Sequence, residues 1–401
     1  MSSEAVTAER ARGALLGLAV GDALGTTYEF ARIEQPPYPA LATEPATDVI
    51  GDGPFGLAPG AITDDTQLAV CLARSLAEQR GFDAADVAER YVAWQDEAFD
   101  IGNQTRSSLR AIEDTGSTAG GMIAWRASQY QAAGNGSLMR TTPIAVALGR
   151  VKLDHSTVSF TPTTPTSPGE AAGSIAHLAV MIDASIADSM LTHADPRCML
   201  ACAAHNAAIA TAITANEVDA LERGRTMVAA ARAAVIEGAR RLTAMWSGGV
   251  SSADAGDVTL ESIDIEIGEV DDVELALVEK ARVELLHDLD KALAETPQVY
   301  GEDDPDMHLY ERAGFVRLAF RLAFWHAAHT PTWRAALVDI ASRGGDSDTN
   351  CAIAGGLLGA RDGVAGIPAA WIDRVLAARQ PGSDEWAEAH HPKHLLALVE
   401  N

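Results

Sequence analysis

The chain is poor in basic side chains and in cysteine and has no long apolar run, and each shortage excludes a class of protein. Only 30 of its 401 residues are Lys or Arg, against 56 Asp and Glu, so the formal net charge is −26. Nucleic acids and anionic membranes bind proteins mainly through clusters of Lys and Arg. We therefore expect neither nucleic acid nor a membrane among the partners of this protein.

Cysteine is scarce, since the chain has only four, Cys71, Cys198, Cys202 and Cys351, and no Cys-x-x-Cys pair. This number is too low for the disulfide framework of a secreted protein, so a reducing, cytoplasmic location is expected. Cys198, Cys202 and His205 would share one face of a helix, where they could bind zinc. The favoured interpretation is that they are small packing residues in an alanine-rich helix.

The apolar runs are too short to cross a bilayer, and the N-terminal region does not resemble a signal peptide. Glu4, Glu9, Arg10 and Arg12 precede a short apolar stretch that glycines interrupt. A signal peptide needs a positively charged start and then an unbroken apolar segment. The sequence therefore predicts neither a secretion signal nor a membrane span.

Helical periodicity dominates what is present. Apolar residues make up 47% of the chain, and in most long windows they recur three or four positions apart, which is typical of amphipathic helices. Helices are predicted near residues 7–24, 65–80, 84–98, 105–114, 139–149, 172–190, 196–215, 218–245, 271–296, 308–329, 333–343, 350–360, 368–379 and 384–399. Strand signals are confined to a short alternation at 263–267, so we predict an all-α fold.

No linker separates two self-sufficient cores, so we predict one domain over residues 1–401. Two stretches are expected to be insertions in that domain, 153–170 and 247–310. The first is rich in Ser, Thr and Pro, and the second begins with an acidic, polar segment. Neither composition favours a packed core face.

The first candidate site segment is Thr63-Asp64-Asp65-Thr66, directly before a run with leucines four positions apart. Thr63 or Asp64 could cap the predicted helix by accepting a hydrogen bond from a free N–H group. A cap uses one acidic residue at most and leaves the second unexplained. A hard divalent cation would use both carboxylates and an adjacent hydroxyl group.

A second segment of the same kind, Gly344-Gly345-Asp346-Ser347-Asp348-Thr349, precedes another predicted helix. Taken alone, it could equally be a capped helix after a glycine turn. Together the two segments supply six oxygen ligands, and oxygen-only ligation favours Mg²⁺, Mn²⁺ or Ca²⁺ over Zn²⁺. The carboxylates are too many for one Mg²⁺ that keeps its waters, so a pair of divalent cations is predicted.

Two glycine-containing segments complete the pattern. Glycines at positions 13, 17, 21 and 25 form a stripe along one predicted helix, followed by Asp22 and Glu29. Close helix packing and the approach of a ligand are both compatible with that stripe. Gly134-Asn135-Gly136-Ser137 leads into a further helix, where free N–H groups could bind a phosphate or where the chain could simply turn.

In this order, the motifs resemble those of the ADP-ribosylglycohydrolase family. The resemblance covers most of residues 10–215 and 310–380 and rests on Gly13–Gly25, Thr63–Thr66, Asp100–Asn103, Gly134–Arg140, Thr192–Pro196 and Gly344–Thr349. It implies a compact, orthogonal bundle of helices with a binuclear Mg²⁺ or Mn²⁺ centre. The metal ligands that it implies are Thr63, Asp64, Asp65, Asp346, Asp348 and Thr349.

The resemblance also implies roles for residues outside the two acidic segments. Asp100 matches a catalytic carboxylate, and Glu29 matches an acid close to the metals. The loop Gly134, Asn135, Gly136 and Ser137 matches the segment that holds the ribose and phosphates, and His193 matches a position near the pyrophosphate. Ala132-Ala133 and Thr26-Thr27-Tyr28 depart from the family pattern, which leaves the acceptor of the ADP-ribose group open.

The expected function is therefore metal-dependent hydrolysis of the glycosidic bond between ADP-ribose and an acceptor. The expected substrates are ADP-ribosylated proteins or small-molecule ADP-ribose conjugates, and hydrolysis would proceed through an oxocarbenium-like state with acid–base help from Asp100 or Glu29. Two alternatives remain open from the sequence alone. The chain could be a binuclear-metal hydrolase of another ADP-ribose conjugate or a phosphoester, or a non-catalytic binding or structural relative.

Overall fold

The computed structural model describes residues 3–149, 178–248, 265–294 and 307–400, and in these ranges the regular elements are helices joined by turns and three isolated β-bridges. The all-α prediction is confirmed. The α-helices are α1 (Ser3–Gly25), α2 (Asp64–Gln79), α3 (Ala84–Trp94), α4 (Asn103–Thr115), α5 (Gly120–Ala127), α6 (Thr142–Leu148), α8 (Ala179–Thr192), α9 (Pro196–Thr214), α10 (Ala220–Trp246), α11 (Asp272–Ala294), α12 (Val316–His329), α13 (Trp333–Arg343), α14 (Ser347–Asp362), α15 (Ala369–Ala377) and α16 (Asp384–Ala389). The 3-10 helices are η1 (Thr26–Tyr28), η5 (Val364–Gly366) and η6 (Pro392–Leu398).

The closest helix pair is α1 with α14, and the glycine stripe explains why. A Cβ atom added at Gly13, Gly17, Gly21 or Gly25 would lie 2.2–2.3 Å from a carbonyl oxygen of Gly359, Gly355, Cys351 or Ser347, respectively. The two antiparallel backbones therefore lie in direct contact, with no side chain of α1 between them at these positions. The close-packing interpretation of the stripe is confirmed, and we call this contact the glycine interface.

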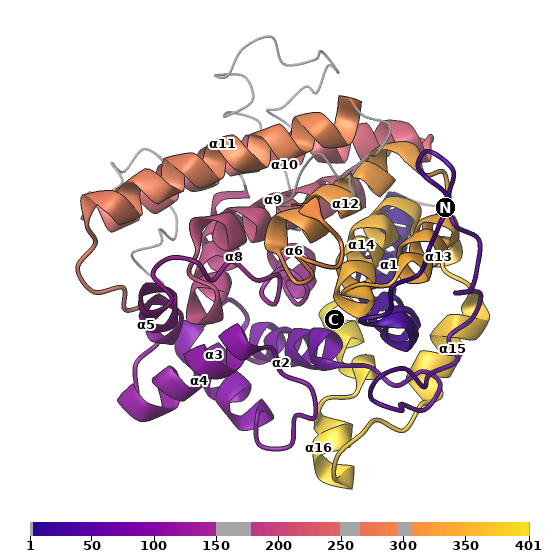
Figure 1. Cartoon of the computed structure of the whole chain (residues 1–401), viewed down its shortest axis with the longest axis horizontal. Coiled ribbons are helices and arrows are strands. Elements are labelled where there is room, and N and C mark those ends of the chain that lie inside the picture. Colours follow the sequence, from indigo (N-terminus) through magenta and orange to yellow (C-terminus); the bar gives the residue numbers. More distant parts are fainter. Residues whose placement is uncertain (1–2, 150–177, 249–264, 295–306, 401) are drawn as a thin grey trace.

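Around this pair the other helices form layers (Figure 1). Helices α10 and α11 lie side by side across one face, and α9 packs beneath α10. Helices α12 and α13 pack against α14, while α2 to α5 form the magenta and purple side of the molecule. The core is apolar and rich in alanine, which allows helices to approach closely. Among the described helices, none combines the length and the apolar composition that crossing a membrane requires.

Most predicted helices occur, but several boundaries were wrong, and the helix predicted over 384–399 is divided into α16 and the 3-10 helix η6. Helix α6 begins at Thr142 because residues 136–140 form turns, and α12 begins at Val316 after an irregular segment. Helix α5 was not predicted. Residues 172–177, at the start of the predicted helix 172–190, lie outside the described residues, and α8 begins at Ala179.

Of the two predicted insertions, 153–170 lies outside the described residues, as do 249–264 and 295–306 of the second. The described part of 247–310 includes α11 and an irregular segment before it, which is fixed to α5. The Arg126 guanidinium of α5 donates to the Ile267 carbonyl (3.0 Å), to the Glu269 carbonyl (2.6 Å) and to the Glu274 carboxylate (2.6 Å). The described part of the second predicted insertion is therefore packed against α5.

Candidate metal centre

The two acidic segments meet although they lie almost 300 positions apart in the sequence. They occupy the first turns of α2 and α14, which begin side by side next to the C-terminal end of α1. The Thr63 hydroxyl lies 3.1 Å from Asp65 Oδ2, and the Thr349 hydroxyl lies 3.4 Å from the same oxygen. Asp65, which is fully buried, thus contacts both segments.

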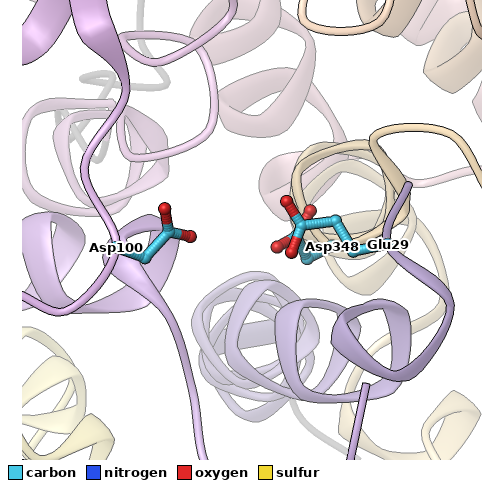
Figure 2. Close-up of side chains that lie close together, drawn as sticks. All are labelled: Glu29, Asp100 and Asp348. Carbon is cyan, nitrogen blue, oxygen red and sulfur yellow. The ribbon is translucent and has the colours of Figure 1, made fainter. Parts of the chain in front are cut away.

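Two further acids reach the same place. Oxygen atoms of Glu29, Asp100 and Asp348 lie within 4.8 Å of one another. Figure 2 shows that Asp100 extends into the group from one side, whereas Glu29 and Asp348 extend into it from the other. Asp100 belongs to the segment before α4, and Glu29 follows η1. Four separate chain segments therefore supply carboxylates to one region.

Glu29 is held beside α14 by backbone hydrogen bonds that follow it directly. The Phe30 N–H donates to the Gly345 carbonyl (2.6 Å), and the Gly345 N–H donates to the Ala31 carbonyl (3.0 Å). Gly344 adopts a left-handed φ of 72°, and a Cβ there would lie 2.1 Å from the Ala31 carbonyl oxygen. Glycine at this position thus lets the segment that carries Glu29 lie against the loop that carries Asp346.

In neither segment does the residue before the helix use its side chain as a cap. Thr63 precedes α2 and Asp346 precedes α14, and neither side chain accepts a capping hydrogen bond from a backbone N–H group of its helix. The capping interpretation that the sequence left open therefore does not explain these residues. Their oxygen atoms face the acidic cluster instead, where a cation could bind them.

The first turn of α2 is held by Asp22, a fully buried residue of α1. Its carboxylate accepts hydrogen bonds from the N–H group (3.1 Å) and hydroxyl group (2.8 Å) of Thr63 and from the N–H group (3.1 Å) and hydroxyl group (2.5 Å) of Thr66. Asp22 thus satisfies N–H groups that a cap would otherwise satisfy, but from another helix. Burial raises the pKa of Asp22 to about 6, and the bonds from Thr66 and Thr63 oppose that rise.

The Gly134–Ser137 loop lies against the α14 segment. The Asn135 side-chain amide donates to Asp346 Oδ2 at 2.7 Å, and the Asn135 N–H donates to the Gly314 carbonyl at 2.9 Å. No hydrogen bond within the described residues uses the N–H groups of Gly136 and Ser137. The loop is therefore fixed next to the carboxylates, and the N–H group of the half-buried Gly136 is left for a ligand, whereas Ser137 is fully buried.

His193 lies behind this loop and is almost fully buried. A Cβ at Gly134 or Gly136 would lie 3.3 Å or 3.0 Å from its Nε2 atom, so both glycines allow the ring to pack directly on the loop. Its Nδ1 atom lies 2.8 Å from the Thr192 hydroxyl. Burial lowers the pKa of His193 well below its ordinary value, so the ring is neutral and supports the loop by packing.

Burial and mutual repulsion raise the pKa of the clustered carboxyls. Burial is the larger cause for Glu29, whose pKa rises to about 8, and the charges of Asp100 and Asp346 add to the rise. Burial and then neighbouring carboxylates also raise the pKa well above its ordinary value for Asp64, Asp65 and Asp348. Buried charges of one sign are unfavourable unless positive charge compensates them.

The donor set fits divalent cations. Glu29 Oε2 and Asp65 Oδ1 are buried and have no hydrogen-bond partner, although buried polar atoms are normally satisfied. The surrounding donors are carboxylate and hydroxyl oxygens, which are the ligands that Mg²⁺ and Mn²⁺ prefer. A bound cation would satisfy these atoms and reduce the repulsion.

The zinc alternative at Cys198, Cys202 and His205 finds no support. The Cys198 thiol donates to the Gly134 carbonyl at 3.1 Å, and the Cys202 thiol lies 3.5 Å from the Ser137 hydroxyl. Burial raises the pKa of Cys202 to about 12, which keeps the thiol protonated. Of the described residues, only Glu29, Asp100 and Asp348 form a group with metal-ligand spacing. The two thiols instead pack α9 against the Gly134–Ser137 loop.

The structure thus brings together the residues that the sequence singled out. The eight candidate acids and threonines surround one region, in which the Asp64 side chain shares a hydrogen bond with Asp100. Asn135 contacts this region through Asp346, and His193 lies behind the loop. Sequence reasoning did not identify the part that Asp22 plays, although Asp22 was noted beside the glycine stripe. The sequence did contain one signal for this role, because Asp22 is an acidic residue in a helical stretch, residues 13–25, that otherwise consists of glycine and apolar residues.

Comparison with known proteins agrees with these features. The sequence profile of the ADP-ribosylglycohydrolase family matches residues 3–399. The ADP-ribosylarginine hydrolase Tri1 of Pseudomonas putida is 41% identical over 147 residues, which cover 34% of this chain and 36% of that protein. The ADP-ribosyl-[dinitrogen reductase] glycohydrolase of Rhodospirillum rubrum is 38% identical over 144 residues, covering 35% of this chain and 45% of that protein. The aligned parts therefore span less than half of either relative.

A solved structure, an ADP-ribosylglycohydrolase-related protein complex, has the same fold. It superposes with a TM-score of 0.59 over 98% of both chains at 23% sequence identity. The expected bundle of helices is thereby confirmed over almost the whole length.

Proposed function

The chain belongs to the ADP-ribosylglycohydrolase family, and from this premise we propose that it hydrolyses the glycosidic bond between ADP-ribose and an acceptor, chiefly a protein side chain. The observation that carries the proposal is the convergence of carboxylates from four chain segments on one region. The buried oxygen atoms of Glu29 and Asp65 that have no hydrogen-bond partner support a ligand site in that region. The names of the two aligned bacterial relatives support an ADP-ribosylated protein as the substrate.

The proposed centre holds two divalent cations, Mg²⁺ or Mn²⁺. The residues that would hold them are Thr63, Asp64, Asp65, Asp346, Asp348 and Thr349. When bound, the ions supply positive charge that orients the two hydroxyl groups of the distal ribose and favours deprotonation of water. The same charge would offset the repulsion between an anionic substrate and a chain of net charge −26.

Asp100 and Glu29 are the proposed acid–base residues. Hydrolysis adds the oxygen of water to C1″ of the ribose, breaks the bond from C1″ to the acceptor, and returns a proton to the acceptor. Asp100 is only partly buried and stands opposite Glu29 across the cluster, so it can exchange a proton with a water or a leaving group. Glu29 is the second candidate, because its unpartnered Oε2 atom belongs to the same group.

The Gly134–Ser137 loop is proposed to bind the ribose and the phosphates. The side chain of Asn135 is fixed beside Asp346 (2.7 Å), next to the proposed ions. The N–H group of the half-buried Gly136 can donate to a phosphate oxygen. His193 would act through the loop, since it supports the two glycines from behind.

Peptides that carry ADP-ribose on arginine or on serine, supplied with Mg²⁺ or Mn²⁺, test the proposal. We expect release of free ADP-ribose, and loss of that activity by about a thousandfold or more in Asp65→Ala, because several ligands of the centre act as one unit. Mg²⁺ or Mn²⁺ should raise the melting temperature of the metal-free wild type and leave that of Asp65→Ala unchanged.

The matched control is Asp114→Ala, which removes an exposed carboxylate at the end of α4 and should keep full activity. Full activity of Asp65→Ala would overturn the metal assignment. Release of phosphate instead of ADP-ribose would identify a phosphoester hydrolase, and a wild type that neither binds the ions nor hydrolyses any conjugate would be a non-catalytic relative.

A further inference from the structure

Two exposed phenylalanines are direct sequence neighbours of acids of the centre. Phe30 follows Glu29, and Phe99 precedes Asp100. Their side chains are 65% and 36% exposed, and among the described residues no other aromatic side chain is exposed. The chain is poor in aromatic residues (5%), and the other described rings are buried or half-buried. Both exposed rings therefore belong to residues next to an acid of the same cluster, and this placement requires an explanation.

A loop at residues 51–57 connects the two positions. The Thr27 hydroxyl of η1, just before Glu29, donates to the Gly51 carbonyl at 2.8 Å. At the other end of the loop, the Phe55 ring lies edge-on to the Phe99 ring, with centroids 5.5 Å apart and an interplanar angle of 69°. We call Phe30, Phe55 and Phe99 the aromatic rim.

The conformation of Phe30 is unfavourable for the folded chain alone. Its φ is 58°, in the left-handed region that aromatic residues rarely occupy. Its ring stays largely in water, so it gains little by burial. Strained residues with exposed rings cluster at binding sites, where a ligand compensates for both disadvantages. The backbone bonds between the segment after Glu29 and Gly345 hold Phe30 in this conformation.

The charge around the rim indicates what it binds. Phosphates are matched by the proposed ions and by the free N–H group of Gly136 in the Gly134–Ser137 loop. Aromatic faces attract cations, and a guanidinium group also stacks on them as a plane. The carboxylate of Asp100, which follows Phe99 and is not one of the proposed metal ligands, would strengthen that attraction. The rim thus suits a planar, cationic group better than it suits the anionic half of the substrate.

We propose that the aromatic rim binds the acceptor part of the substrate, a guanidinium-bearing side chain with its flanking polypeptide, and so determines which acceptor is cleaved. The inference rests on the proposed hydrolase function and adds the residues that select the acceptor. The ADP-ribose part would then be bound by the metal centre and the Gly134–Ser137 loop.

Steady-state kinetics of Phe30→Gly and Phe30→Tyr on a peptide ADP-ribosylated at arginine test the inference. Glycine removes the ring and suits the left-handed backbone, so this variant should fold. We expect its KM to rise about five- to twentyfold, as for the loss of one cation–π contact, with kcat changed less than twofold. The inhibition constant of free ADP-ribose should stay unchanged, because ADP-ribose lacks the acceptor. Phe30→Tyr keeps a ring and should restore the KM of the wild type.

Val283→Ala is the control, since it truncates another exposed apolar side chain (54% exposed) on α11. It should match the wild type in every measurement. An unchanged KM in Phe30→Gly would overturn the inference. So would an equal weakening of ADP-ribose inhibition, which would show that the ring stacks on adenine instead. A wild type that cleaves no conjugate would overturn the proposed function and this inference with it. That result differs from the two preceding outcomes, in which the wild type is active and only the role of the rim is refuted.

Discussion

The two acidic segments of the centre resemble one another in sequence but are positioned by different means. The α2 segment is held by one side chain, since the Asp22 carboxylate accepts from both Thr63 and Thr66. The α14 segment is held by the backbone contact at the glycine interface, to which the Ser347 hydroxyl adds a hydrogen bond to the Gly25 carbonyl at 2.7 Å. Helix α1 thus positions both segments. It holds the α2 segment through the Asp22 carboxylate, and it holds the α14 segment through glycines that let the two backbones touch.

This difference indicates how each half of the centre should respond to mutation. A contact distributed over four glycines should tolerate the loss of any single hydrogen bond but not the addition of a methyl group. A segment that depends on one buried carboxylate should instead be sensitive to the loss of that carboxylate's hydrogen bonds. Three substitutions, taken from the largest expected effect to the smallest, test this contrast.

Gly17→Ala should have the largest effect on stability. The new Cβ would lie 2.2 Å from the Gly355 carbonyl oxygen, so α1 and α14 must separate. We expect the free energy of unfolding, measured by urea denaturation, to fall by about 3 kcal/mol or more. Gly81→Ala is the control, because nothing lies within 4 Å of its Cβ. Equal stability of the two variants would show that the glycine interface is looser than described.

Asp22→Asn should act mainly on the α2 half. The asparagine amide places N–H donors against the Thr63 and Thr66 donors, so the first turn of α2 loses acceptors. We expect Mn²⁺ to bind about ten- to a hundredfold more weakly by isothermal titration calorimetry, as for lost support of metal ligands. Hydrogen exchange should accelerate in the first turn of α2 and not in α14.

Asp219→Asn is the matched control, since Asp219 is an ordinary N-cap that accepts from the Glu222 N–H at 2.8 Å on α10. It should leave Mn²⁺ affinity unchanged. Unaltered Mn²⁺ affinity in Asp22→Asn as well would mean that α2 keeps its position without this carboxylate.

Ser347→Ala should have the smallest effect. It removes the bond to the Gly25 carbonyl but leaves the glycine interface in place. We expect a loss of about 1 kcal/mol in the free energy of unfolding and a change of less than twofold in Mn²⁺ affinity. A loss of affinity as large as that in Asp22→Asn would refute the contrast, because α14 would then also depend on a side-chain anchor.

Much of the fold could be predicted because apolar periodicity is a local property of the sequence. Helix α5 was missed because Gly120 and Gly121 stand where a cap and good helix formers were expected. The structure shows why the second glycine is there, since a Cβ at Gly121 would lie 2.1 Å from the Met190 carbonyl oxygen. A glycine that is needed because a distant helix packs closely against it cannot be recognised from the residues around it in the sequence.

The same distinction applies to the site. The acidic segments could be found because each carries its chemistry within a few consecutive residues. The part played by Asp22 could not, because its partners lie 41 and 44 positions away and only the folded chain brings them together. The aromatic rim also depends on exposure, which a sequence with few aromatic residues does not reveal.

The glycine interface also constrains how the protein is made. Helix α1 is synthesised before its partner, because Ser347 follows 322 residues after Gly25. At ordinary rates of synthesis, the nascent chain must wait roughly 20–60 s before that partner exists. During that interval the bare glycine face of α1 has no backbone to cover it, and the second acidic segment has not been synthesised. Assembly of the centre must therefore wait until α14 has been synthesised, and molecular chaperones have a long window in which to act on the unfinished chain.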